Sequence, residues 1–243
     1  MKTITFMNQL GGTGKTTSAW ALGTGLQKKG YKVLLVDLDC HRNLTSRAGL
    51  DQKGVADSIY EVFQGKVDVE NAIYFLNPGL DILIGSLHLF GAGQEFVQGN
   101  KEAMLKEQLE KVQTGYDYCI IDTESRINLL LVSALTASDG VIIPMQDEEY
   151  ALNVMEDLMK IMDYVTKECN PILKIEGFLM MNFRKVVPQE VLLRTEEIAK
   201  QIGTKVFHTI IRSTVRAEEL ALCDYKNFVE EFLENQKEGG TGQ

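Results

Sequence analysis

The feature that most constrains this chain is a glycine-rich turn near its start, NQLGGTGKTT, which runs from Asn8 to Thr17. The apolar segment KTITFM leads into the turn, and a segment with helical character, Thr16–Lys29, leads out of it. Glycine lets the backbone approach an anion closely and direct successive N–H groups at it, and the start of a helix adds positive potential. The turn therefore predicts a phosphate-binding loop between a strand and a helix.

Side chains of the turn add to the contacts that its backbone offers to a nucleotide. Lys15 is expected to reach the β- and γ-phosphates, and the Thr16 hydroxyl is expected to bind Mg²⁺. Gln9 stands where the strict form of the loop has a glycine. The turn residues predicted to bind nucleotide are Gly11, Gly12, Thr13, Gly14, Lys15, Thr16 and Thr17.

Two other apolar runs end in the acidic residues that such a loop requires. The run YDYCIIDTE contains Asp122 at its end, where it is a candidate to hold Mg²⁺, directly or through water. In VLLVDLDC, Asp37 and Asp39 flank Leu38, so their side chains lie on the face opposite to that of Leu38 only while the chain stays extended. One of these two aspartates is expected to reach the metal or an attacking water.

The alternation of apolar strands with helical segments predicts an α/β fold, with a mostly parallel twisted sheet flanked by helices on both faces. A single P-loop domain is expected over residues 1–236, followed by a flexible tail over residues 237–243. A second long helix is expected over Ala151–Lys167, and short helices between Asp51 and Phe75. The predicted strands are Thr3–Met7, Lys32–Asp37, Leu80–Ile84, Tyr118–Asp122, Gly140–Pro144, Ile175–Met181 and Lys205–Thr209.

Charge and cysteine usage restrict the compartment and the partners. The four cysteines are widely spaced without a CxxC pair, which argues against a zinc site and favours a reducing cytoplasm. The acidic C-terminal stretch NFVEEFLENQ has the wrong charge for a membrane-binding helix, so no membrane partner is expected. The chain has a net charge of −9, yet Pro171–Arg216 holds eight basic and four acidic residues, which leaves room for contact with DNA phosphates.

Several motifs in a fixed order identify a family resemblance. GGTGKTT, VDLDCHRNLT, YDYCIIDT, ASDGVIIPMQDEEYAL and VFHTIIRSTVRAEEL together resemble the ParA/MinD family of partitioning and positioning ATPases over roughly residues 1–220. The chain is most similar to the short Soj-like members that lack an N-terminal DNA-reading domain. The resemblance implies binding of ATP and Mg²⁺, a nucleotide-sandwich homodimer, contact with DNA of any sequence, and a ParB-like partner that stimulates hydrolysis.

The resemblance also implies roles for individual residues. Lys15, Asp39 and Asp122 are the predicted catalytic residues, with Asp39 placed to position the attacking water. The predicted metal site consists of Thr16, Asp37 and Asp122, and Asn182 is expected to read the adenine edge. The residues predicted to contact DNA are Arg184, Lys185 and Arg216.

The chain departs from the family pattern at the loop itself. Leu10 replaces the signature lysine that reaches across the dimer to the phosphates of the partner, and a positioned cation of this kind changes phosphoryl-transfer rates by about 10³–10⁵. Glu124 and Ser125 replace two prolines of the family. The Pro-Arg pair that the family has after its late strand is Arg212-Ser213 here, without the proline. Either Arg126 or Arg212 is a candidate replacement for the lysine, and Glu124 is a candidate to polarise water. The three histidines, His41, His88 and His208, form no metal or triad pattern and are expected to be structural.

Three functions remain open on this basis. The first is a ParA-like ATPase of low activity that segregates or positions DNA, such as a plasmid, mobile element or chromosome. The second is a nucleotide-gated binding or regulatory module with little hydrolysis, which Leu10 favours. The third keeps the fold and the ATP but positions a protein cargo without DNA.

Overall fold

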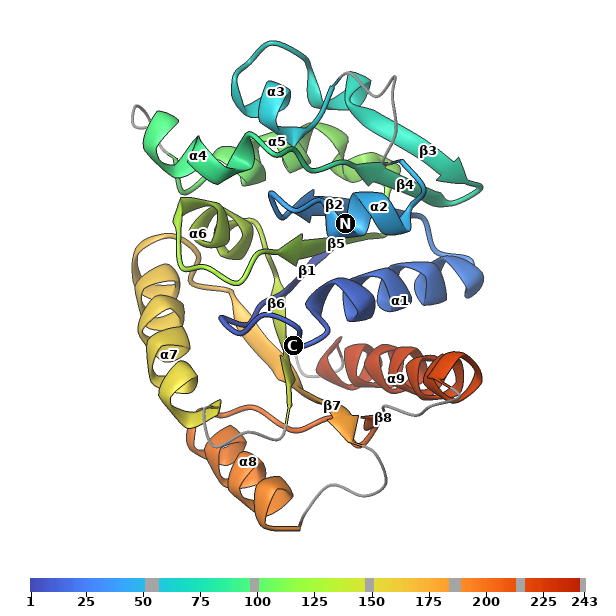
Figure 1. Cartoon of the computed structure of the whole chain (residues 1–243), viewed down its shortest axis with the longest axis vertical. Helices are drawn as coiled ribbons and strands as arrows, with labels where there is room; N and C mark the ends of the chain where they lie inside the picture. The colour runs from blue at the N-terminus through green and yellow to red at the C-terminus, as the bar shows by residue number, and fades with distance from the viewer. Residues whose placement is uncertain (51–56, 97–100, 147–150, 184–188, 213–216, 241–243) are drawn as a thin grey trace.

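A sheet of mostly parallel strands forms the centre of the molecule (Figure 1). The computed structural model describes residues 1–50, 57–96, 101–146, 151–183, 189–212 and 217–240. Across these residues the sheet has eight strands in the order β3-β4-β2-β5-β1-β6-β7-β8, and β3 is antiparallel to its neighbour. The strands are β1 (Lys2–Phe6), β2 (Val33–Leu38), β3 (Ile73–Asn77), β4 (Leu80–Leu83), β5 (Tyr118–Thr123), β6 (Gly140–Met145), β7 (Lys174–Phe183) and β8 (Ile211–Arg212).

Helices cover both faces of this sheet, as the sequence predicts. Helices α1 and α9 lie side by side against one face, and α4 to α7 lie across the other (Figure 1). The helices are α1 (Lys15–Lys28), α2 (Asn43–Arg47), α3 (Ile59–Phe63), α4 (Leu89–Glu95), α5 (Met104–Val112), α6 (Leu129–Thr136), α7 (Ala151–Glu168), α8 (Gln189–Gln201) and α9 (Ala217–Gly240), with short 3₁₀ helices η1 (Val69–Asn71) and η2 (Gln113–Gly115).

The apolar runs of the central strands are explained by burial on two sides. In β2, Val33 and Leu35 belong to the core beneath α1 and α9, whereas Leu34 and Val36 belong to the core beneath α4 to α6. Because successive side chains of a strand point to opposite faces, a strand covered on both faces needs apolar residues at every position. The predicted fold class is confirmed.

Helix α1 ends at a glycine in the left-handed conformation. Gly30 has a φ of 93°, and its N–H donates to the carbonyl of Gln27 at 2.9 Å. The N–H of Tyr31 reaches back to the carbonyl of Leu26 at 3.2 Å, which completes a Schellman motif. The helix therefore stops at a fixed point, so that β2 begins in register beside β5.

Six of the seven predicted strands are confirmed, with ends shifted by at most two residues, and the seventh is wrong. Within Lys205–Thr209 only Val206 forms a β-bridge, and β8 lies a little further on. The backbone N–H groups of His208 and Thr209 donate instead to the Glu231 carboxylate on α9, at 2.7 and 2.9 Å. A side chain of the neighbouring helix thus takes the place of a strand partner.

Two other differences concern a strand that the sequence pattern missed and the end of the chain. The strand β3 is an edge strand whose residues are at most half-buried, and its first three residues fall in the Asp51–Phe75 region where only short helices were expected. Helix α9 continues to Gly240, so the first four residues of the predicted flexible tail are helical. Within the described chain, no helix is both long enough and apolar enough to span a bilayer.

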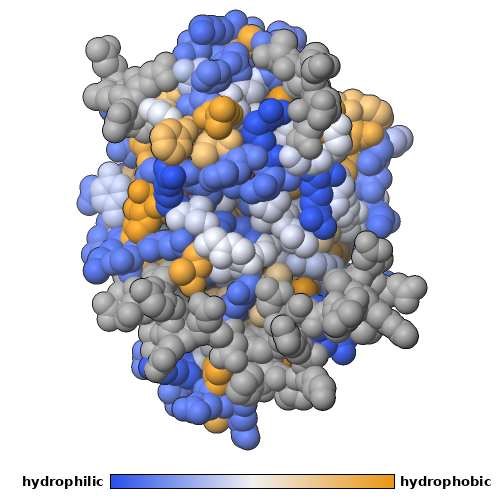
Figure 2. Space-filling view, viewed as in Figure 1, coloured by the Kyte–Doolittle hydropathy of each residue, from blue (hydrophilic) through white to orange (hydrophobic). Residues whose placement is uncertain are grey.

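The face seen in Figure 1 is largely hydrophilic, and its hydrophobic side chains stand in small separate groups (Figure 2). Isolated apolar residues of this kind are normal on a protein surface. The buried polar and charged residues that indicate a functional site lie instead at the carboxyl ends of the neighbouring strands β1, β2 and β5.

Candidate nucleotide site

The predicted phosphate-binding loop connects β1 to α1. Gly12 and Gly14 have φ angles of 77° and 87°, in the left-handed region that glycine adopts without strain. Gly14 is also the N-cap of α1, and the N–H of Ser18 donates to its carbonyl at 2.8 Å. The start of this 14-residue helix adds positive potential to the N–H groups of the loop, so the local structure suits an anion.

A substitution of Gly14 by alanine tests this conformation. A Cβ at Gly14 would lie 2.4 Å from Cε of Met181, which is flexible and is able to move, but the left-handed φ remains strained. We expect Gly14→Ala to lower the free energy of unfolding by about 1–2 kcal/mol, measured by urea denaturation. Gly11→Ala is the matched control, because its φ is not left-handed and a Cβ there meets nothing within 4 Å. Equal stability of the two variants would contradict the strained geometry.

Side-chain hydrogen bonds hold the loop from both ends. The Asn8 amide donates to the Pro144 carbonyl at 2.7 Å, while its Oδ1 accepts the N–H of Leu10 at 2.9 Å. The Gln146 amide donates to the Gly12 carbonyl at 2.7 Å. Both outside contacts come from the end of β6 or the residue after it, so this strand supports the loop directly.

Lys15, the first residue of α1, is buried with 6% of its surface exposed. Its Nζ donates to the carbonyl of Leu10 at 3.1 Å and to Oγ of Ser125 at 2.6 Å. Burial lowers the pKa of the ammonium group, and the nearby Asp122 acts in the opposite direction. The ammonium therefore lies between the glycine loop and the loop after β5, with neutral acceptors that a phosphate oxygen would exceed in strength.

Asp122 is the most unusual group of the site. It is fully buried in β5, and among the described residues neither carboxylate oxygen has a partner in hydrogen-bond geometry. Burial raises the pKa of Asp122 well above its ordinary value, the neighbouring Asp37 raises it further, and the nearby Thr16 hydroxyl acts in the opposite direction. A buried carboxylate without a partner is unfavourable, and a bound cation is one established way to satisfy it.

Asp37 lies beside Asp122 in register on β2, but its oxygens are already engaged. One oxygen accepts the N–H of Asp39 at 3.0 Å, and the other accepts the N–H and the hydroxyl of Thr45 at 2.8 and 2.6 Å. Burial raises the pKa of Asp37 to about 6 despite these bonds. The side chain therefore anchors the segment from β2 to α2, which carries Asp39.

Asp39 faces the cavity beyond the end of β2. Its Oδ1 accepts hydrogen bonds from the N–H of His41 and pairs with Nδ1 of the same ring, each at 2.8 Å. Its Oδ2 accepts a bond from the Asn43 amide at 3.3 Å. The carboxylate is thus held by local contacts within its own turn, and it remains close to Lys15, whose pKa it raises.

These groups surround a cavity of about 680 Å³. It brings the predicted loop residues together with Asp39, while Asp37 and Asp122 are fully buried beneath the strand ends. Its donor set, which combines loop N–H groups, an ammonium, hydroxyls and carboxylates, fits a phosphate chain with Mg²⁺. The lining residues are Gly11, Gly12, Thr13, Gly14, Lys15, Thr16, Thr17, Asp39, His41, Asn43, Arg47, Glu124, Ser125 and Arg126.

Four other predicted residues stay predictions, because their side chains are not among those that the structure describes. The backbone of Asn182 lies in β7, and its side chain is not among those described. Arg184, Lys185 and Arg216, the predicted DNA contacts, lie outside the described residues.

The structure adds residues that the motifs did not identify as part of the site. Ser125 contacts the Lys15 ammonium, and His41 contacts Asp39, although the sequence marked it only as an isolated histidine. Glu124, the predicted candidate to polarise water, also lines the cavity; its carboxylate accepts a hydrogen bond from Asn128, and its other oxygen lies 3.7 Å from Sγ of Cys40. Position directly after a predicted strand end was the one available signal for these residues, since their types alone do not indicate phosphate chemistry.

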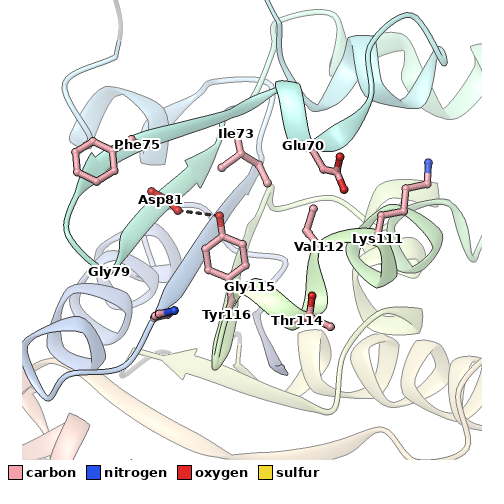
Figure 3. Close-up of a pocket in the computed structure, with 11 residues that line it drawn as sticks. Glu70, Ile73, Phe75, Gly79, Asp81, Lys111, Val112, Thr114, Gly115 and Tyr116 are labelled. Atoms are coloured by element: carbon pink, nitrogen blue, oxygen red, sulfur yellow. Dashed lines mark hydrogen bonds between the residues drawn. The ribbon is translucent and has the colours of Figure 1, made fainter.

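A second cavity, of about 590 Å³, lies at the opposite ends of the strands (Figure 3). The Tyr116 hydroxyl points to Asp81 and donates to its carboxylate at 2.8 Å. Burial raises the pKa of Tyr116, so the phenol remains protonated and the pair is satisfied. Its charged lining residues are balanced, with Lys32 and Lys111 against Glu70 and Asp81, so it lacks the anion-binding character of the first cavity.

Comparisons with known proteins agree with this geometry. The family described as an AAA domain matches residues 1–175. The sporulation initiation inhibitor protein Soj of Bacillus subtilis is 39% identical over 222 residues, which cover 90% of this chain and 87% of Soj. The chromosome partitioning protein ParA of Caulobacter vibrioides is 32% identical, covering 90% of this chain and 83% of ParA.

A solved structure shows the same arrangement in three dimensions. The cobyrinic acid a,c-diamide synthase of Mycobacterium smegmatis, solved with bound ADP and magnesium, aligns with a TM-score of 0.88 and 29% identity. The alignment covers 98% of this chain and 96% of that one. Together with the phosphate loop and the order of the motifs, these comparisons show that the chain belongs to the ParA/MinD family of P-loop ATPases.

Proposed function

We propose that this protein binds ATP with Mg²⁺ at the cavity around Lys15, hydrolyses it slowly, and uses the nucleotide to control a homodimer that segregates or positions DNA. The observation that carries the nucleotide assignment is the placement of the orphaned Asp122 carboxylate beside the buried Lys15 ammonium and the glycine loop. Among the described residues Lys15 donates only to neutral acceptors and Asp122 has no partner in hydrogen-bond geometry, so a magnesium-bound phosphate chain would supply the charged partners that both groups lack. The relative solved with ADP and magnesium supports this choice of ligand.

Different residues of the site bind the phosphates, the magnesium ion and the adenine of this ligand. The loop N–H groups and Lys15 bind the phosphates, and Thr17 and Thr13 extend the same surface. Thr16 and Asp122 hold Mg²⁺, which when bound neutralises phosphate charge. Asp37 supports this site from β2, with its own oxygens engaged by Thr45 and Asp39. Asn182 is assigned to the adenine edge.

Hydrolysis requires a positioned water and a stabilised phosphoryl group. Asp39 orients the water, whose oxygen bonds to the γ-phosphorus while the bond from that phosphorus to the β–γ bridging oxygen breaks. The products are ADP and inorganic phosphate, and the remaining proton passes to the solvent. Leu10 supplies no cation for the charge that develops, so we expect a slow reaction, with Lys15, Asp39 and Asp122 as its catalytic residues.

Restoring a cation at Leu10 should increase the rate. The backbone carbonyl of Leu10 accepts from Lys15 and Ser125 whatever its side chain, so Leu10→Lys is expected to leave the loop intact. We expect at least a tenfold increase in the single-turnover rate of ATP hydrolysis, a modest part of the effect that positioned cations have elsewhere. Leu10→Met is the matched control without charge. A rate equal to that of the control would show that the absent lysine does not limit hydrolysis.

The assignment of DNA as cargo rests on the relatives and on basic residues of the C-terminal third. Soj and ParA are named for sporulation and chromosome partitioning, respectively. Arg184, Lys185 and Arg216 are the assigned phosphate contacts, and a ParB-like protein is the assigned activator. Contacts with DNA phosphates release counterions, so affinity should fall steeply as salt increases. DNA binding measured with ATP across a salt series tests this part, and a flat, negligible signal would leave positioning of a protein cargo.

A second candidate is a nucleotide-gated binding module that dimerises on ATP but hardly hydrolyses it. The replacement of the signature lysine by Leu10 favours this function. Single-turnover hydrolysis, with and without DNA, separates the two, because the module would bind ATP and show no turnover under either condition. Absence of nucleotide binding would contradict both.

A further inference from the structure

One arginine of the nucleotide cavity, Arg126, contacts an aromatic ring and makes no ion pair with another described residue. Arg126 lines the cavity, and its guanidinium carbon lies 4.8 Å above the ring of Phe90. Phe90 belongs to α4 and is 66% exposed, so this contact is at the surface. Among the described residues Arg126 has no carboxylate within ion-pair distance. Its charge is therefore not committed to a structural partner there.

The other candidate cation is engaged elsewhere. Arg212 donates through Nε and Nη2 to the Asp224 carboxylate at 3.1 and 2.5 Å, and it does not line the cavity. Its bidentate pair fastens β8 to α9. If Arg212 moved to a phosphate, it would leave the carboxylate of Asp224, which is only 3% exposed, without its charged partner. Arg212 is therefore a poor candidate for phosphate contact.

The position of Arg126 in the chain brings it near the predicted phosphate-binding residues. It directly follows Ser125, whose hydroxyl lies 2.6 Å from the Lys15 ammonium. A lysine at this position of a phosphate loop reaches the β- and γ-phosphates. The chain segment that carries Arg126 is thus tied to the end of the cavity where the terminal phosphate would lie.

We propose that Arg126 is the cation that contacts the γ-phosphate of ATP, reached by rotation of its side chain away from Phe90. This rests on the proposed ATP function of the site. Arg126 then makes the site sensitive to the difference between ATP and ADP and supplies in the same subunit part of the charge that Leu10 lacks. Without nucleotide the guanidinium of Arg126 stacks on the Phe90 ring, and this contact competes with the contact to the phosphate.

Magnitudes favour the phosphate over the ring. An exposed cation–π contact changes an equilibrium by about a factor of 2 to 5, whereas a hydrogen bond between charged groups changes it by about a factor of 10 to 150. The side chain is exposed and unbranched, so a rotation is not blocked by packing. The guanidinium fork also matches phosphate oxygens in two-bond geometry.

The test compares affinities for ADP and for a non-hydrolysable ATP analogue, both with Mg²⁺, by calorimetry on the full chain. Arg126→Ala is expected to weaken the analogue at least tenfold and ADP less than twofold, and to slow single-turnover hydrolysis at least tenfold. Arg126→Lys is expected to recover part of both losses. Phe90→Ala removes the competing contact and is expected to strengthen the analogue by about a factor of 2 to 5, with ADP unchanged. A melting curve for each variant checks folding.

Arg47→Ala is the matched control, because Arg47 is also an exposed arginine that lines the cavity but lies on α2. It should affect the analogue and ADP equally. The proposal is overturned if Arg126→Ala keeps the wild-type ratio of the two affinities, or if Arg47→Ala shifts that ratio as strongly. Either result, with wild-type binding intact, leaves the ATP site standing, whereas a wild-type protein that binds neither nucleotide contradicts the proposed function itself.

Discussion

Replacement of Lys15 by alanine is expected to abolish measurable binding of ATP and ADP. The ammonium is buried between the glycine loop and Ser125, and no other described basic group is buried in the cavity to take its place. Loss of charged hydrogen bonds to two phosphates should weaken binding at least 100-fold, or about 3 kcal/mol. Calorimetry with each nucleotide and Mg²⁺ measures the change.

Lys28→Ala is the control for this variant. Lys28 is an exposed lysine in the last turn of the same helix, so the control removes an equal charge without touching the loop. It should bind nucleotide as the wild type does. Retained affinity in Lys15→Ala would contradict the assignment of the turn as a phosphate loop, whatever the hydrolysis rate.

Asp122→Asn is expected to make the protein more stable while removing its response to Mg²⁺. The carboxylate group is fully buried, and among the described residues no donor meets its oxygens in hydrogen-bond geometry, although the Thr16 hydroxyl is near; burial raises its pKa well above the ordinary value. Replacing a buried carboxyl group that lacks a hydrogen-bond partner should raise the free energy of unfolding by about 1–3 kcal/mol at neutral pH, with a melting temperature higher by about 2–4 °C for each kcal/mol. Thermal melts without nucleotide measure the gain, and nucleotide titrations with and without Mg²⁺ measure the loss.

Asp37→Asn provides a matched comparison on the neighbouring strand. Asp37 accepts three hydrogen bonds from Thr45 and Asp39, so an amide there would place a donor against a donor. We expect this variant to be destabilised by about 1–3 kcal/mol, opposite in sign to Asp122→Asn. Destabilisation of equal size in both variants would show that Asp122 is a structural group rather than a cation ligand.

The pH dependence of stability follows from the same carboxyl groups. Burial raises the pKa of Asp37 from 3.8 to about 6, so the folded protein holds this proton more tightly than the unfolded chain. The associated stability is fully present below about pH 4 and is lost as the pH rises to about 6, a change of about 3 kcal/mol. Asp122 acts in the same direction, so the advantage of Asp122→Asn over the wild type should grow from pH 4 to pH 8.

Much of the central sheet could be predicted because its strands are buried on both faces. An almost continuous apolar run such as VLLVDL fits a strand that is covered on both faces. The glycine-rich turn indicated the strand before it and the helix after it. The edge of the sheet was less predictable. In β3 the residues are at most half-buried, and at His208 and Thr209 a distant carboxylate, Glu231, replaces the expected strand partner.

The candidate site shows the same division between local and distant causes. Lys15, Asp39 and Asp122 follow from position at the loop or at a strand end, and the structure brings them together. Asp37 and Thr45, which are hydrogen-bonded, lie eight positions apart in the sequence, and Lys15 and Ser125 lie 110 positions apart. No periodicity or motif reports such pairings, because they arise only when the parallel strands align.

The two side chains that fasten the glycine loop to the end of β6, Asn8 and Gln146, bear on how readily the protein captures its ligand. Apparent affinity falls in proportion to the fraction of molecules that hold a binding-competent conformation, and folding itself orders this loop. The affinity for nucleotide therefore depends on the position of β6, although no residue of β6 lines the cavity. A partner that shifts the end of β6 would loosen the hold on nucleotide from outside, without entering the site.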